Sequence, residues 1–169
     1  MPFRLACLAL AFAALAGCDS NGPTSALREL DGTYSVAELV FDPVTASLPD
    51  ADVGARLDAQ TSFDIFSGNS TVLFTIGRGA AGRSLATLDV TATRGRATFT
   101  ARTGNEDELA ALFLPRTFSL TYDPASPRTL TGELALTDVD LQAFDPQQYQ
   151  DQRAVRGTLR IRLDRRATS

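Results

Sequence analysis

The segment SLATLDVTATRGRATFTAR, residues 84–102, contains two alternating runs joined by the dipeptide Arg94-Gly95. Apolar side chains occupy every second position of 86–92, and they do so again over 97–101. A period of two places successive side chains on opposite faces of a β-strand. The segment therefore predicts an antiparallel hairpin with one apolar and one polar face.

The same alternation recurs on both sides of this hairpin. Together with 84–93 and 96–102, the pattern predicts strands at 33–41, 62–66, 71–76, 117–122, 129–137 and 153–164. Short helices are expected at 105–113, where Asn105 precedes three acidic residues, and at 50–57. We find no segment with the period of a long helix.

Eight strands of this kind can bury their apolar faces by closing into a barrel or by packing as two sheets. Most of the predicted connections are short, which favours an up-and-down order over long crossings. The prediction is an all-β chain that forms an eight-stranded antiparallel up-and-down barrel with one or two short helices. A β-sandwich is the alternative.

The segment LDGTYSVAELVFD, residues 30–42, resembles the opening of lipocalin-like barrels, in which a Gly-x-Trp motif begins the first strand. Gly32 and Tyr34 occupy the corresponding positions, with Tyr in place of Trp. The resemblance implies that the aromatic ring packs across the closed end of the barrel. It also implies that an arginine from the last strand lies over this ring, and Arg160 or Arg162 is expected to do so.

The N-terminus has a short basic segment followed by an apolar run over 5–15, which is too short to cross a bilayer as a helix. The run ends in Leu15-Ala16-Gly17-Cys18, which resembles the lipobox of bacterial lipoproteins. The resemblance implies a signal peptide over 1–17 and a lipidated Cys18 that attaches the protein to a membrane. Residues 18–29 are rich in turn-forming side chains and are expected to form a flexible tether, so the folded domain is expected to span 30–169.

The expected location is the bacterial cell envelope, with the outer membrane or cell surface favoured. Asp19 resembles the residue that retains some lipoproteins at the inner membrane of enteric bacteria, so the periplasmic face of the inner membrane is the alternative. Cys7 lies within the predicted signal peptide and would be removed with it. No other thiol would then accompany Cys18.

The composition excludes several classes of function. The chain has a net charge of −4 and contains no histidine, and all its basic side chains are arginine. The acidic balance argues against a nucleic-acid partner. Without histidine or lysine there is no imidazole base, histidine metal ligand or Schiff-base lysine. The acidic loop 138–151 lacks the spacing of a calcium-binding loop. From these absences together we expect no enzyme activity, no cofactor and no bound metal.

Aromatic residues on the apolar faces are the candidates for ligand binding: Phe41, Phe63, Phe74, Phe99, Phe118 and Tyr122. An eight-stranded barrel is just wide enough to be filled by side chains or to hold one small ligand. One hypothesis is therefore a lipoprotein that binds a small hydrophobic molecule. The other is a structural or accessory envelope protein with a filled core, which acts through surface contacts with other proteins.

The arginines of the last strand and its end, 156–166, form the densest basic feature of the chain. They could meet anionic headgroups or an acidic partner. A solvated strand face is the simpler interpretation.

Overall fold

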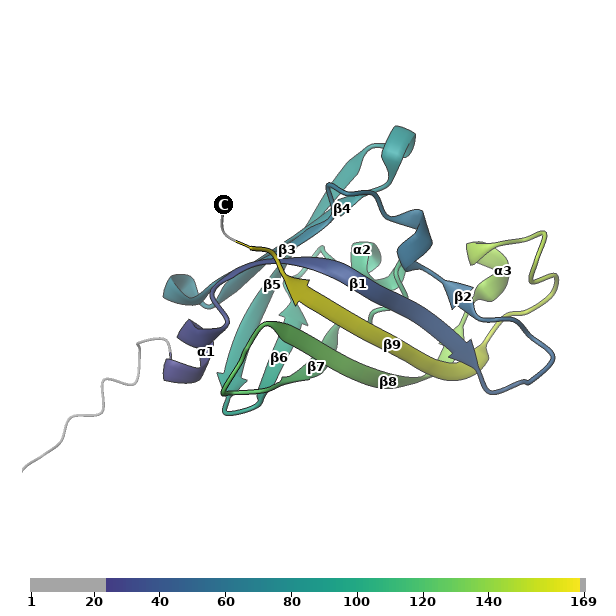
Figure 1. Ribbon diagram of the computed structural model, residues 1–169. Coiled ribbons are helices and arrows are strands. Elements are labelled where there is room, and N and C mark those ends of the chain that lie inside the picture. Colours follow the sequence, from purple (N-terminus) through teal and green to yellow (C-terminus); the bar gives the residue numbers. More distant parts are fainter. Residues whose placement is uncertain (1–23, 168–169) are drawn as a thin grey trace, which may run out of the picture.

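The computed structural model describes residues 24–167, and eight strands in this range close into an antiparallel barrel (Figure 1). Each strand pairs with the next along the chain, and the last pairs back onto the first. The strands are β1 (Gly32–Pro43), β3 (Ser62–Phe66), β4 (Thr71–Gly77), β5 (Arg83–Thr93), β6 (Arg96–Ala101), β7 (Thr117–Tyr122), β8 (Thr129–Val139) and β9 (Val155–Arg165). The predicted up-and-down barrel is confirmed.

Short elements connect the strands. A ninth strand, β2 (Ala51–Asp52), pairs with the second half of β1. The α-helices are α1 (Ser25–Glu29), α2 (Glu106–Ala110) and α3 (Leu141–Phe144), and the 3-10 helices are η1 (Gly54–Arg56), η2 (Ser67–Asn69) and η3 (Gly79–Ala81). The helices expected at 50–57 and 105–113 are present in shorter form as η1 and α2, whereas α1 and α3 were not predicted.

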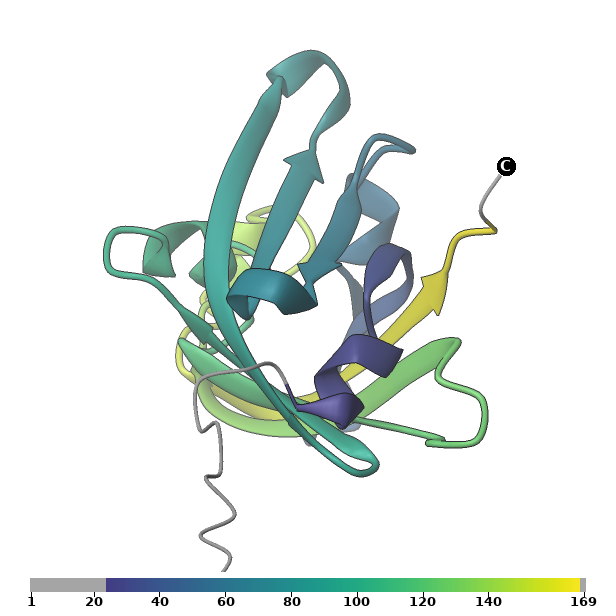
Figure 2. The same ribbon diagram turned by 90° about the vertical axis from the view of Figure 1, so that its left-hand side faces the viewer.

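Helix α1 lies across one end of the barrel, which we call the α1 end (Figure 2). Its side chain Leu27 and the following Leu30 are both buried in the core. The Thr24 hydroxyl caps the helix by accepting a hydrogen bond from the Leu27 amide, and it donates one to the Ala92 carbonyl oxygen at 3.1 Å. Residues 24–29 therefore belong to the folded body, which begins before the predicted residue 30, and the rest of the predicted tether, 18–23, lies outside the described residues.

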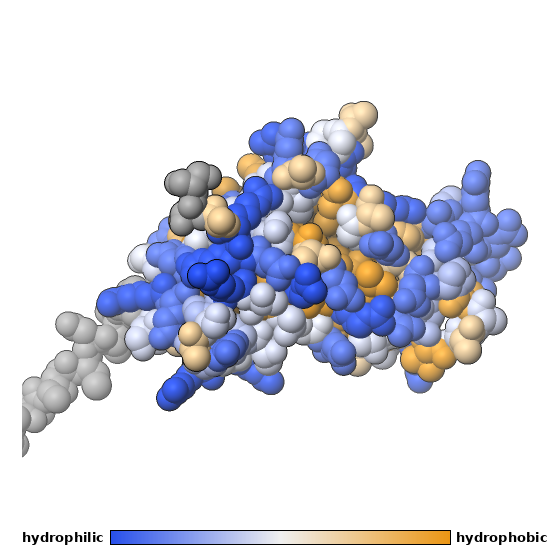
Figure 3. All heavy atoms as spheres, in the orientation of Figure 1, coloured by the Kyte–Doolittle hydropathy of each residue, from blue (hydrophilic) through white to orange (hydrophobic). Residues whose placement is uncertain are grey.

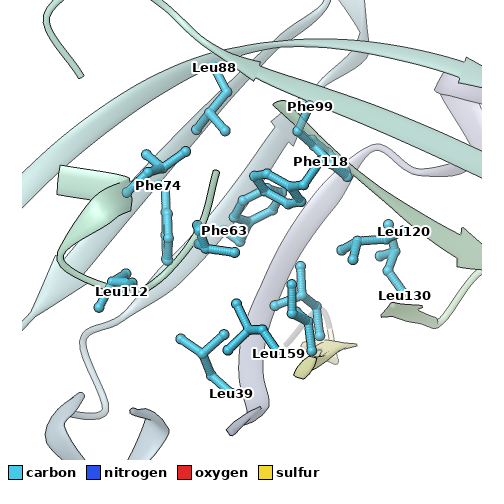
Figure 4. Packing of buried hydrophobic residues seen from close by; sticks show 14 of the residues in the cluster. Leu39, Phe63, Phe74, Leu88, Phe99, Leu112, Phe118, Leu120, Leu130 and Leu159 are labelled. Carbon is cyan, nitrogen blue, oxygen red and sulfur yellow. The ribbon is translucent and has the colours of Figure 1, made fainter. Parts of the chain in front are cut away.

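The alternating apolar residues fill the middle of the barrel. Phe63 packs edge-on against Phe74 and Phe99, with ring centroids 5.3 and 5.1 Å apart, and Phe99 stacks on Phe118 at 5.2 Å (Figure 4). Burying one such side chain contributes about 1.5–3 kcal/mol to folding. This row of four rings makes the centre of the barrel a packed core.

A bulge in β1 changes which of its side chains face inward. Tyr34 is buried on one side of the bulge, and Leu39 and Phe41 are buried on the other. The pairing register with β9 shifts between Val36 and Glu38, which accounts for the change. Glu38 is consequently turned to the outer surface of the barrel, although it lies in an otherwise apolar strand.

Candidate ligand-binding site

The barrel widens at the end opposite α1, which we call the pocket end. Strands β7 and β8 pair at only two positions, Thr121 with Thr131 and Tyr122 with Leu130. Toward the pocket end, β8 pairs with β9 alone. Leu136 on this part of β8 is therefore only partly buried.

A pocket of about 860 Å³ occupies this end of the molecule. This volume is within the range of small-molecule sites, which are usually concave and mostly apolar. Figure 3 shows apolar surface gathered toward this part of the molecule. The lining residues come from η1, the β4–β5 connection, α2 and its C-terminal extension, the end of β8, and α3: Val53, Arg56, Leu57, Arg78, Ala110, Ala111, Leu112, Phe113, Leu114, Pro115, Leu136, Thr137, Asp138, Val139, Asp140, Ala143 and Phe144.

Phe113 in the pocket wall has a left-handed backbone conformation, with φ of 60°. It follows α2 at a position where helices usually place glycine, and the Leu114 amide closes the turn by donating to the Leu109 carbonyl oxygen. A left-handed conformation costs a non-glycine residue about 1–2 kcal/mol. The Phe113 ring offsets part of this cost by packing against Phe41 and Phe144, with centroids 5.7 and 5.3 Å away.

Two arginines line the pocket, and both are paired with carboxylates. The Arg56 guanidinium lies 3.5 Å from the centroid of the Phe144 ring and 3.5 Å from the Asp145 carboxylate. Arg78 lies 3.3 Å from the Glu108 carboxylate. Asp138 and Asp140 also line the pocket, but both are exposed and Asp140 caps α3. The two arginines are compensated, so the apolar side chains that make up most of the wall set the character of the pocket. It suits an apolar or weakly polar molecule.

The six aromatic residues predicted to contact a ligand are all buried in the barrel. The pocket is lined by a different set of residues, and none of the six is among them. Phe41 comes nearest, through its contact with the Phe113 ring. Tyr122 lies toward the α1 end, where its hydroxyl donates to the Thr93 carbonyl oxygen at 3.0 Å.

The expected motif at the closed end is present with a different arginine. Arg165, rather than Arg160 or Arg162, lies over the Tyr34 ring, with its guanidinium carbon 5.8 Å from the ring centroid. Gly32 has φ of 140°, a conformation that other residues rarely adopt, and a Cβ there would lie 2.9 Å from Arg165 Nε, so a larger residue would be strained and would displace the Arg165 side chain. Burial raises the pKa of the Tyr34 hydroxyl, which donates to the Leu30 carbonyl oxygen at 3.1 Å.

Arg160 instead lies on the outer surface of the barrel, where it contacts three carboxylates. Its guanidinium nitrogens are 3.2 Å from Glu38, 3.1 Å from Asp42 and 3.2 Å from Asp50. Hydrogen bonds to Glu38 and Asp50 raise the pKa of Arg160. The cluster ties β9 to β1 and to the segment before β2, and it plays no part in the closed end.

The acidic loop uses its carboxylates for local structure. Asp140 caps α3 by accepting a hydrogen bond from the Ala143 amide at 2.9 Å. Asp145 accepts hydrogen bonds from the amides of Gln147 and Gln148, each at 3.0 Å. Within residues 24–167, no three Cys, His, Asp or Glu side chains gather as a metal site would require.

Comparisons with protein-family models, with curated proteins and with solved structures found no match to this chain. No helix within residues 24–167 has the length and apolar character needed to cross a bilayer. The predicted signal peptide, the predicted lipidation site Cys18 and Asp19 lie outside the described residues.

Proposed function

We propose that this protein is a lipid-anchored lipoprotein of the bacterial envelope, whose barrel binds a small hydrophobic molecule without catalysis. The observation that carries the binding proposal is the pocket of about 860 Å³ with its mainly apolar wall. The anchor rests on the resemblance of Leu15-Ala16-Gly17-Cys18 to a lipobox.

The arrangement of the barrel supports reversible binding. The packed rings of Phe63, Phe99 and Phe118 give the pocket end a rigid base. Side chains from the connecting segments, such as Phe113 and Phe144, form the wall. A preformed apolar site loses little conformational entropy when a ligand enters, which favours affinity.

A thermal-shift screen tests the binding proposal. The chain used begins at Asp19, because every strand of the barrel and helix α1 lie within residues 24–167. It is screened against fatty acids, isoprenoids and phospholipids, and native mass spectrometry detects any lipid that copurifies. A ligand at about 100 times its dissociation constant adds about 2.7 kcal/mol to stability. This corresponds to a rise in Tm of about 5–10 °C for a domain of this size.

Two matched variants locate the site. Leu136→Gln places an amide in the pocket wall, and we expect it to abolish the shift. Leu85→Gln makes the same change at a side chain that is 55% exposed and outside the pocket, so its shift should equal that of the unchanged chain. If no compound raises the Tm and no lipid copurifies, the alternative of a structural protein acting through its surface is favoured.

The anchor is tested separately in cells. The full chain should incorporate labelled palmitate and should be found in the membrane fraction. The Cys18→Ser variant should show neither the label nor membrane association. Labelling that persists in Cys18→Ser would overturn the proposed anchor.

A further inference from the structure

The α1 end concentrates arginines that have no carboxylate partner. None of them forms an ion pair with another residue in the part of the chain that the structure describes, whereas Arg56, Arg78, Arg102, Arg116, Arg160 and Arg162 all do. Nine arginines within residues 24–167 form no ion pair, and six of them lie at this end: Arg28 on α1, Arg94 and Arg96 at the β5–β6 turn, Arg128 before β8, and Arg165 and Arg166 at the end of β9. The other three, Arg83, Arg153 and Arg156, lie toward the pocket end.

Four of the six arginines are fully available to an external anion: Arg28, Arg94, Arg96 and Arg128 are exposed and have no side-chain hydrogen bond within residues 24–167. Arg165 donates one hydrogen bond to the Glu29 carbonyl oxygen, and Arg166 donates to those of Ala59 and Thr61, which leaves other guanidinium N–H groups of both free to donate. Figure 3 shows strongly hydrophilic surface beside the C-terminal end of β9. A hollow of about 770 Å³ opens there, with Arg128, Arg165 and Arg166 in its lining and Asp31 as its acidic member.

The charge of the barrel is distributed unevenly between its two ends. At the α1 end the six arginines outnumber the carboxylates, which are Glu29, Asp31, Asp64, Asp123 and Asp164. The chain as a whole has a net charge of −4, so the excess of carboxylates lies elsewhere. Asp138, Asp140 and Asp145 around the pocket belong to that excess.

The chain enters the barrel at the basic end. Thr24 caps α1, and its hydroxyl donates a hydrogen bond to the Ala92 carbonyl oxygen at the end of β5. Cys18 precedes Thr24 by six residues, and an extended chain of that length spans at most about 20 Å. A lipid on Cys18 would therefore hold the α1 end within about 20 Å of the membrane surface.

We propose that the α1 end is a docking surface for a membrane rich in anionic phospholipids, with headgroup phosphates bound by the six arginines. This inference rests on the lipid anchor of the proposed function. In this orientation the pocket end points away from the bilayer. The pocket would then exchange its ligand with the aqueous phase or with another protein rather than with the membrane beneath it.

Screening allows the negatively charged chain to dock in this way. Strand β9 has 11 residues, which at about 3.3 Å each and a tilt of about 40° separate the two ends by nearly 30 Å. The Debye length at about 0.1 M salt is near 10 Å. The membrane therefore acts on the basic end, while the acidic pocket end lies beyond most of its field.

Phe66 adds an apolar contact at the same end. Its ring is 48% exposed where β3 meets η2, and the adjoining Ser67 is hydrogen-bonded to Asp31 beside α1. Phenylalanine is among the apolar side chains that interfacial segments bury at the boundary between headgroups and acyl chains. The ring is placed to enter the interface when the arginines contact phosphate.

Vesicle sedimentation of the chain that begins at Asp19 tests the proposal without the covalent lipid. We expect binding to phosphatidylcholine vesicles that contain phosphatidylglycerol, release at high salt, and no binding to phosphatidylcholine alone. If the chain does not sediment with the vesicles that contain phosphatidylglycerol, the proposal is wrong. Neither palmitate labelling nor the thermal shift depends on this result, so failure of docking is distinguishable from failure of the anchor or of ligand binding.

Two variants with the same change in net charge separate a docking face from a general effect of charge. One variant carries Arg28→Gln, Arg94→Gln, Arg96→Gln and Arg128→Gln. The other carries Arg83→Gln, Arg116→Gln, Arg153→Gln and Arg156→Gln at exposed positions toward the pocket end. We expect the first variant to weaken vesicle binding by about fivefold per arginine, and the second to bind nearly as well as the unchanged chain. Equal losses in the two variants, at unchanged circular dichroism and Tm, would refute the proposal.

Phe66→Ser gives an independent measurement, with Leu85→Ser as its control. The two side chains are similarly exposed, at 48% and 55%, but Leu85 lies on β5 away from the α1 end. Severalfold weaker vesicle binding is expected only for Phe66→Ser. The same affinity in both variants would remove the ring from the docking surface.

Discussion

Replacing Phe99 with alanine tests whether the centre of the barrel is packed or hollow. Phe99 is fully buried and contacts the rings of Phe63 and Phe118 at centroid distances of 5.1 and 5.2 Å. Removing a ring from a packed site loses its transfer free energy and leaves a cavity, at a combined cost of about 3–5 kcal/mol. We therefore expect Phe99→Ala to lower the free energy of unfolding by about 4 kcal/mol.

The expected change is measurable by urea unfolding and by thermal melting, both followed by circular dichroism because the chain contains no tryptophan. For a domain of this size, about 4 kcal/mol corresponds to a Tm lower by about 8–16 °C. Phe66→Ala removes the same ring from a position that is 48% exposed, and it should cost about 1 kcal/mol or less. If Phe99→Ala costs no more than this control, the rings border an empty interior and the packed core is refuted.

Three further changes test other parts of the barrel. Gly157→Ala should cost about 2 kcal/mol or more in urea unfolding, because its Cβ would lie 2.4 Å from both the Asp42 carbonyl oxygen and the Phe41 ring; an unchanged midpoint would contradict this. Burial raises the pKa of Tyr34, so the native state keeps this proton at a pH where the unfolded chain loses it, and stability should fall above about pH 10. Tyr34→Phe should flatten this fall in unfolding measured at several alkaline pH values, and an equally steep fall would argue against Tyr34 as its source. Arg160→Gln should cost about 1 kcal/mol or less, because its carboxylate partners are partly exposed, and the loss should shrink as salt is added; a larger, salt-independent loss would assign Arg160 a packing role.

The strands were predictable because alternation has a direct physical cause. In β5 and β6 the apolar residues Leu88, Val90 and Phe99 are all buried, as a period of two requires when one face meets the core. Closure of the sheet into a barrel was also predictable. Eight strands that are joined by short connections, each with one apolar face, have few other ways to bury those faces.

Helix α1 was missed because its composition resembles a linker. Leu27 is the only strongly apolar residue of 24–29, and Leu30 follows directly after it. An isolated helix this short has no stability of its own. Its stability comes from burying Leu27 and Leu30 against the end of the barrel. Such a contact depends on the closed barrel and cannot be inferred from local sequence.

The pocket was unpredictable for a related reason. Much of its wall comes from segments without strand periodicity, including η1, the extension of α2 through Phe113, and α3. The alternation of apolar residues predicts that Leu136 faces the interior of the barrel. It does not predict along what length β7 and β8 stay hydrogen-bonded to each other. The two strands part after two pairs, and this separation opens the pocket end.

The arginine over Tyr34, in contrast, could have been identified from the sequence. On β9 the buried side chains Leu159 and Leu163 occupy odd positions, so Arg160 and Arg162 must face outward. An arginine that covers an inward-facing ring at the closed end has to share the odd parity and lie near the end of the strand. Arg165 is the residue of β9 that meets both conditions, and it is the one found over the ring. The resemblance to a known motif led to the expected contact, but the strand period decides which arginine can make it.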